Sequence, residues 1–283
     1  MLSLHTNNAA LSAQNAIAKT QSNLSTAMTR LSTGLRINAA SDDAAGLQIA
    51  TRLKAQTSGM AMAMKNTQNA TSMLQTASGS FTEVTNMLIR MKDLATQAAD
   101  SSSSTEDKTA MQSEYDALGL ELGNVMNNTT FGGTKLLTGG TLASAMTFQI
   151  GASQSETMAV DVSTSLSTLA TSIGAASANF TAAATGTELT GSANATIGLL
   201  TTAINDVGTV NSALGATINR LDHVNSNLSN ISTNTESATG RIMDTDFATE
   251  SANMTSNQML LQAGTAMLKQ SNSMSSLVMS LLQ

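Results

Sequence analysis

The sequence contains no cysteine, no proline and no tryptophan, and each absence excludes something. Without cysteine, the chain forms no disulfide or zinc–thiolate site and has no thiol nucleophile. Because a proline inside a helix costs about 3 kcal/mol, a chain of 283 residues without one can build long, uninterrupted helices. Aromatic residues make up only 2%, so alanine, leucine and methionine must fill the interior, which suits thin helix–helix seams.

Charge is also scarce, at 11% of residues with a net charge of −6. This balance leaves no basic patch for nucleic acid and gives no support for binding to anionic membranes. The sequence has no run of about 18 apolar residues, so we expect no membrane insertion. Its first residues, MLSLHTNNAALSAQ, do not resemble a secretory signal peptide, so we expect any export to use a route without a cleaved signal.

Both ends of the chain carry seven-residue apolar repeats and almost no charge. The first expected helix, Leu4 to Leu31, has one stripe at Ala10, Ile17, Leu24 and Leu31 and a second at Gln14, Gln21 and Met28. The last, Phe247 to Leu282, has its stripe at Leu260, Ala263, Met267, Gln270, Met274, Leu277 and Leu281. Neutral ends can pack densely without burying unpaired ions. We expect them to be loosely ordered in a monomer and to order fully among neighbouring copies.

The longest pattern is a 4-3 apolar repeat that runs unbroken from Ile49 to Ala98. A helix of this length, about 80 Å, is typical of a coiled coil. We expect Ser41 to cap it, with Asp42 and Asp43 at its positive end. Two more helices are expected, over 106–126 and over 194–235. The latter has Leu200, Val207, Leu214, Leu221 and Leu228 in one heptad position and Ile204, Asn211, Ile218 and Asn225 in the other. The sequence therefore predicts a mainly α fold, a long coiled-coil or helical-bundle rod.

The residue pattern changes after the helix expected over 106–126. Leu136 and Leu137, the turn residues 138–140, and the alternating Met146, Phe148 and Ile150 predict a small β-hairpin near 134–150. The segment 151–192 is rich in alanine, serine, threonine and glycine and only weakly patterned. We expect it to form an exposed, variable tip.

No residues form a recognisable catalytic, cofactor-binding or metal-binding set. His5 and His223 are the only histidines, and nothing in the sequence brings them together. Residues 132–135, GGTK, lack the spacing of a phosphate-binding loop and predict a tight turn. We expect no catalytic, cofactor or metal site and no enzyme activity.

Two segments carry a family resemblance. Residues 29–50, TRLSTGLRINAASDDAAGLQIA, closely resemble the N-terminal segment of bacterial flagellins. The C-terminal residues 241–250, 262–265 and 281–282 independently resemble the final segment of that family. The likeness covers roughly 1–150 and 195–283, and the short centre is most similar to lateral, swarming-type flagellins. Gln283 departs from the arginine with which the family usually ends.

The resemblance implies a secreted structural protein that polymerises into the extracellular flagellar filament. Residues 1–40 and 241–283 would pair as an inner tube domain, and 41–240 would form an antiparallel rod domain. Export would use the flagellar type III channel, and the implied partners are other copies, an export chaperone, the cap protein and the hook–filament junction proteins. From the apolar stripes, we expect the polymerisation seam at Ile17, Leu24, Leu31, Leu260, Met267, Leu277 and Leu281.

Flagellins are also ligands of immune receptors. Residues 29–50 resemble a stretch that a plant receptor kinase senses, and 88–99 resemble the surface that a vertebrate Toll-like receptor reads. By similarity, Arg90, Leu94 and Glu114 would make the Toll-like receptor contact. Ile89 stands where the family often has glutamine.

Other functions stay open at this point. A hook–filament junction protein or another secreted coiled-coil rod would also have long helices. The short centre and the two terminal motifs favour the filament subunit.

Overall fold

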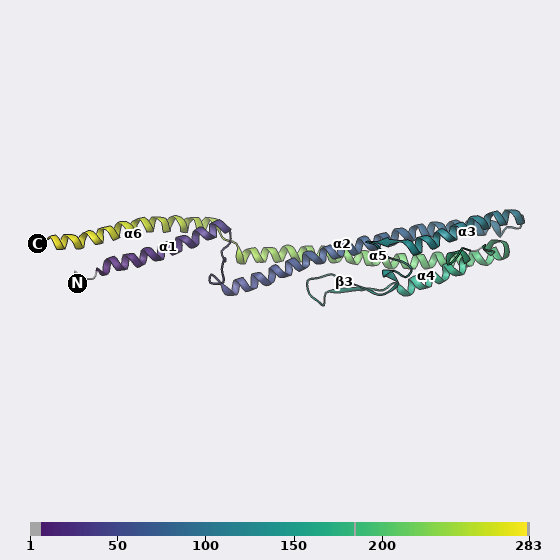
Figure 1. Cartoon of the computed structure of the whole chain (residues 1–283), viewed down its shortest axis with the longest axis horizontal. Helices are drawn as coiled ribbons and strands as arrows, with labels where there is room; N and C mark the ends of the chain where they lie inside the picture. Colours follow the sequence, from purple (N-terminus) through teal and green to yellow (C-terminus); the bar gives the residue numbers. More distant parts are fainter. Residues whose placement is uncertain (1–6, 184, 282–283) are drawn as a thin grey trace. The chain divides into compact units, whose positions relative to one another are not determined.

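The computed structural model describes residues 7–183 and 185–281, with side chains up to Met274. Figure 1 shows long helices that account for most of the chain, as the sequence predicts. In chain order the α-helices are α1 (Asn8–Thr33), α2 (Ala44–Ala98), α3 (Thr105–Asn128), α4 (Ser163–Ala176), α5 (Glu188–Met243) and α6 (Phe247–Leu281). The strands are β1 (Thr130–Phe131), β2 (Thr134–Lys135), β3 (Met146–Gln149) and β4 (Thr157–Val160), and the 3-10 turns are η1 (Thr141–Ala143) and η2 (Ala178–Phe180).

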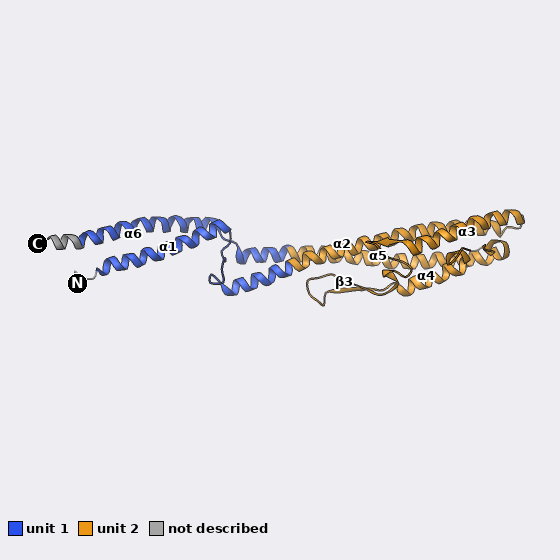
Figure 2. Ribbon diagram, viewed as in Figure 1, with its two compact units in different colours: residues 1–57, 233–283 blue, residues 58–232 orange. Residues whose placement is uncertain are grey.

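The chain divides into two compact units, which Figure 2 colours separately. Unit 1 comprises residues 1–57 and 233–283, and unit 2 comprises 58–232. The long helices α2 and α5 contribute residues to both units. The functional boundaries expected from the sequence, after residue 40 and before residue 241, stay a prediction.

The core of unit 2 lies along the seam between α2 and α5. From Met60 onward, the predicted 4-3 repeat of α2 is buried at every position: Met60, Ala63, Thr67, Ala70, Leu74, Ala77, Phe81, Val84, Leu88, Met91, Ala95 and Ala98. Met60 clusters with Leu228, and the Ser78 hydroxyl donates a hydrogen bond to Asn211 Oδ1 at 2.6 Å. The partner's residue number falls as α2 advances, so the two helices are antiparallel. Asn211 occupies the predicted polar seam position, which is typical of residues that fix coiled-coil register.

The structure contains the small β-hairpin that the sequence predicts, but its paired strands are 146–149 and 157–160 and do not both lie within 134–150. The strand at 146–149 exists, but β3 pairs with β4, with Met146 opposite Val160, and β2 pairs with β1. Leu136 and Leu137 are both fully buried in the core of unit 2. Two adjacent side chains of a strand point to opposite faces, so this pair cannot belong to a hairpin with one exposed face.

The segment 151–192 is not the exposed tip that its composition predicts. It contains β4 and α4, and α4 buries Leu166, Leu169, Ile173 and Ala176 against the core of unit 2. These four residues follow helical spacing, which many intervening serines and threonines obscure in the sequence.

The start of α2 differs from the cap that the sequence predicts. Asp43, not Ser41, caps this helix, because Asp43 Oδ1 accepts a hydrogen bond from the Gly46 N–H at 2.9 Å. Asp42 Oδ2 accepts from the N–H groups of Ala39 and Asn38, and these bonds lower the pKa of the Asp42 carboxyl. The adjacent acids therefore shape the turn before α2 and the first turn of the helix.

Tyr115 provides a single optical probe of the core of unit 2. It is the only tyrosine in the chain, it is fully buried, and its hydroxyl donates to the Ala176 carbonyl at 2.6 Å. Burial raises the pKa of this phenol, and the nearby Glu188 and Asp116 raise it further. Because the pKa is higher in the folded state than in the unfolded state, the stabilisation is present below the unfolded value of about 10 and is lost as pH rises above it.

We therefore predict that no phenolate absorbance develops in the native protein near pH 10, and that it emerges only together with loss of helical circular dichroism. Tyr115→Phe should uncouple alkaline unfolding from this group and should cost about 1 kcal/mol at neutral pH, since the Ala176 carbonyl loses its donor. Phenolate absorbance that rises near pH 10 while the helices stay intact would contradict the assignment.

Candidate functional site

The terminal helices α1 and α6 pair side by side in unit 1 and run antiparallel (Figure 1). At the start of α1, Asn7 Nδ2 donates to the Ser271 carbonyl at 3.1 Å. Near its end, Arg30 Nη1 lies 3.8 Å from the Glu250 carboxylate. Asn7 also caps α1, because its Oδ1 accepts from the Ala10 N–H. Polar contacts therefore fix the register of the pair at both ends.

One face of α1 is turned toward α6. The side chains at Ala10, Ala13, Ile17, Thr20, Leu24, Ala27 and Leu31 are buried or half-buried. The structure thus places Ile17, Leu24 and Leu31 on one stripe. The second position of the repeat is Ala13, Thr20 and Ala27, whereas the predicted Gln14, Gln21 and Met28 are exposed.

Helix α6 carries two apolar stripes, and only one of them is covered within unit 1. The inner stripe consists of half-buried residues at 3-4 spacing: Met254, Asn257, Leu261, Gly264, Leu268 and Ser271. A Cβ atom added at Gly264 would lie 2.8 Å from Ile17 Cγ1, so this glycine permits the close approach of the two helices. The apolar repeat of the sequence does not single out the inner stripe, although Gly264 within that repeat is a signal of close helix packing.

The outer stripe is the set predicted from the sequence, here defined by Leu260, Met267 and Met274. These side chains are 56%, 67% and 54% exposed. These large apolar groups therefore face solvent and are not covered by α1, and their role in the polymerisation seam stays a prediction. The side chains of Leu277 and Leu281 lie outside the described residues.

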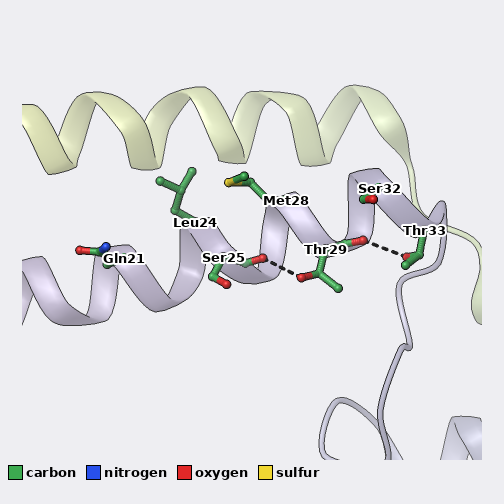
Figure 3. Close-up of a pocket in the computed structure, with 7 residues that line it drawn as sticks. All are labelled: Gln21, Leu24, Ser25, Met28, Thr29, Ser32 and Thr33. Atoms are coloured by element: carbon green, nitrogen blue, oxygen red, sulfur yellow. Dashed lines mark hydrogen bonds between the residues drawn. The ribbon is translucent and has the colours of Figure 1, made fainter.

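Other large apolar side chains of unit 1 are exposed as well. Leu11 and Met28 project from α1, and Phe247 and Met259 project from α6. An open groove of about 410 Å³ lies along α1, and Figure 3 shows that two of its lining residues, Leu24 and Met28, point toward α6. Its lining is uncharged: Gln21, Leu24, Ser25, Met28, Thr29, Ser32 and Thr33. On α6, Leu260, Met267 and Met274 recur every seven residues, and an exposed apolar stripe of this kind is typical of an interaction surface.

The ends of α1 and α6 are tied together where the chain leaves them. Gly34, with a φ of +73°, ends α1, and its N–H donates to the Arg30 carbonyl. Leu35 then forms an isolated antiparallel bridge with Asp244, and the Arg36 N–H donates to the Met243 carbonyl at 2.6 Å. Beside this bridge, Arg30 pairs with the Glu250 carboxylate, which is only 8% exposed as a residue. A buried carboxylate needs such a partner.

The residues expected to contact an immune receptor separate in the structure. Arg90 on α2 and Glu114 on α3 form an exposed ion pair, with Arg90 Nε 2.8 Å from Glu114 Oε1. Leu94 is 2% exposed and belongs to the core of unit 2, so it cannot present its side chain to a partner without rearrangement.

Within residues 7–183 and 185–281, no three histidine, cysteine, aspartate or glutamate residues gather closely enough to hold a metal ion. His223 is exposed on α5, and His5 lies outside the described residues. None of the described helices is both long and apolar enough to cross a membrane.

Two family models match the chain. Residues 4–141 match the bacterial flagellin N-terminal helical region, and residues 197–282 match the bacterial flagellin C-terminal helical region. The segment between them, which contains β3, β4 and α4, is matched by neither model.

Similar curated proteins come from Vibrio species. The chain is 31% identical to flagellin A of Vibrio cholerae serotype O1 and 32% identical to flagellin A of Vibrio anguillarum, each over 380 aligned positions that cover both chains completely. It is 31% identical to polar flagellin C of Vibrio parahaemolyticus, again over the full length of both. These alignments have more positions than the 283 residues of this chain, so the relatives contain additional residues. The lateral-type assignment stays a prediction.

Among solved structures, the chain is similar to Bacillus cereus flagellin. The match has 29% sequence identity and a TM-score of 0.46, and it covers 58% of this chain and 88% of the other.

Proposed function

Because the chain belongs to the bacterial flagellins and is therefore a structural subunit that polymerises into the extracellular flagellar filament, we propose that the outer stripe of α6 is a surface through which its copies pack. The observation that carries this proposal is the exposure of Leu260, Met267 and Met274 on a helix whose inner stripe already contacts α1. The relatives reported above are all named flagellins, which favours a filament subunit over a junction protein.

The free energy of apolar burial supports this role. Covering one leucine or methionine side chain gains about 1.5–3 kcal/mol. In the monomer the outer stripe is exposed, so most of this free energy is not gained. A helix of a neighbouring copy that covers the stripe would provide it. The seam residues expected on α1, Ile17, Leu24 and Leu31, contribute from the other side of the pair, since they are only half-buried by α6.

The distribution of charge supports the same surface. After Glu250 the only charged side chain of the sequence is Lys269, and Glu250 itself is paired with Arg30. Copies can therefore pack against the terminal helices from several sides without burying unpaired charged side chains in an apolar interface, which would cost free energy.

The family resemblance extends the proposal to assembly. Residues 1–40 and 241–283 would line the inner tube, and 41–240 would form the surrounding rod domain. Subunits would pass through the type III export channel unfolded, with a chaperone holding them beforehand. The cap protein would add them at the distal end, and junction proteins would join the filament to the hook.

Leu260→Glu tests the outer stripe. Purified monomer should lengthen filament seeds at least roughly tenfold more slowly with this change, because a carboxylate without a partner would enter an apolar interface. Elongation is measured from seed length by negative-stain microscopy.

Leu120→Glu, which alters an exposed leucine of α3 in unit 2, is the matched control. Its rate of seed elongation should be closer to that of the natural sequence than to that of Leu260→Glu. Both variants should retain the helical circular dichroism of the parent. Normal elongation by Leu260→Glu would remove the outer stripe from the interface.

A second role, as an immune ligand, is supported by the exposed pair Arg90 and Glu114. We propose that a Toll-like receptor binds this pair and that Leu94 acts from beneath by holding α2 in place. Arg90→Ala should strongly lower the response of receptor reporter cells to monomer, whereas Arg220→Ala, at an exposed position of α5, should leave it unchanged. Equal responses to the two variants would exclude the Arg90 contact.

A further inference from the structure

The methionines of the two units differ in exposure. In unit 2, Met60, Met91, Met111, Met126 and Met158 are buried, and among its methionines only Met62 is more than half exposed. In unit 1, four of the methionines with described side chains are more than half exposed: Met28 on α1, and Met259, Met267 and Met274 on α6. These four are here called the methionine set. Two of its members belong to the outer stripe, and Met28 also lines the groove of Figure 3.

An exposed thioether reacts with peroxides and hypochlorous acid, whereas a buried one is shielded. With hydrogen peroxide, the O–O bond breaks and one oxygen atom is transferred to sulfur. The sulfur loses two electrons, the peroxide is reduced to water, and a methionine sulfoxide remains. The flexible apolar side chain thereby gains a strong dipole that needs a hydrogen-bond donor.

We propose that the methionine set is an oxidation site at which peroxide-class oxidants switch off polymerisation of the monomer. This inference rests on the proposed role of the outer stripe in subunit packing. Sulfoxides at Met267 and Met274 would place polar oxygen atoms in the apolar stripe through which the copies pack, where a buried acceptor without a donor opposes assembly.

The residue choice on α6 supports a chemical function beyond packing. The inner stripe, which α1 already covers, has one methionine, Met254, at its start and uses Leu261, Gly264 and Leu268 at its centre. The outer side instead uses Met259, Met267 and Met274 around one leucine, Leu260. Both kinds of side chain fill space, but only the thioether is open to oxygen transfer, and this reaction is reversed by methionine sulfoxide reductases.

The site should therefore depend on the assembly state. In monomer, peroxide should oxidise the methionine set and Met62 well before the buried Met60, Met91 and Met126. In the filament, the methionine set should be covered and should react many times more slowly. Peptide mapping by mass spectrometry after graded peroxide treatment measures both patterns.

The functional test compares treated monomer with untreated monomer of the same variant in seed elongation. For the natural sequence, treatment should slow elongation by roughly tenfold or more, and incubation with the two epimer-specific sulfoxide reductases should restore it. Leucine at all four positions of the methionine set should make the ratio of treated to untreated rates approach one. Met62→Leu, the matched control, should leave the natural sensitivity in place.

The outcomes separate this inference from the function on which it rests. Untreated monomer that fails to elongate seeds would contradict the proposed outer-stripe interface. Treated monomer that elongates normally, or a fourfold leucine variant that stays sensitive through Met1 and Met279, would overturn the oxidation site alone. If the fourfold variant does not elongate seeds at all, the natural sequence provides the test. Elongation that the reductases restore after peroxide treatment, together with slower oxidation of the methionine set in the filament, supports the site. Elongation that the reductases do not restore overturns it.

Discussion

The organisation of unit 1 depends on one constraint: α6 has an apolar band wider than α1 can cover. Gly264 lets Ile17 approach closely, so the inner stripe becomes the intramolecular seam. Leu260, Met267 and Met274 are then left facing solvent on the adjacent stripe. Because apolar surface of this kind is stabilised by burial, the monomer retains a driving force for association that its own fold cannot satisfy.

In unit 2, the apolar faces of the long helices are covered by other elements of the same unit. There α2 and α5 cover each other's seams, and α3, α4 and the strands enclose what remains, so that Tyr115, Phe81 and Leu122 are fully buried. The terminal helices α1 and α6 contain only four charged side chains, Lys19, Arg30, Glu250 and Lys269. The molecule thus combines a self-sufficient core with nearly chargeless ends that retain exposed apolar surface, a division suited to a polymer subunit.

The sequence predicts the long helices and the α2–α5 seam because a 4-3 repeat fixes both the element and its buried face. It does not predict which stripe of α6 pairs with α1, since both stripes are apolar and the choice depends on the close approach at Gly264. The sequence does not predict α4, because serines and threonines between its buried apolar residues obscure the helical spacing. Leu136 and Leu137 are adjacent apolar residues, a pattern that is also typical of strands. Motif similarity singles out Arg90, Leu94 and Glu114, but it reveals neither the ion pair between Arg90 and Glu114 nor the burial of Leu94 in the core.

Site-directed labelling tests the central claim most directly, because the natural sequence has no cysteine to interfere. The account predicts that a maleimide reacts rapidly with Leu260→Cys in monomer and many times more slowly in filaments grown from it. Leu261→Cys, on the inner stripe, should react more slowly than Leu260→Cys in monomer. Equal labelling of Leu260→Cys in monomer and filament would show that the outer stripe stays exposed after assembly, and would contradict the account.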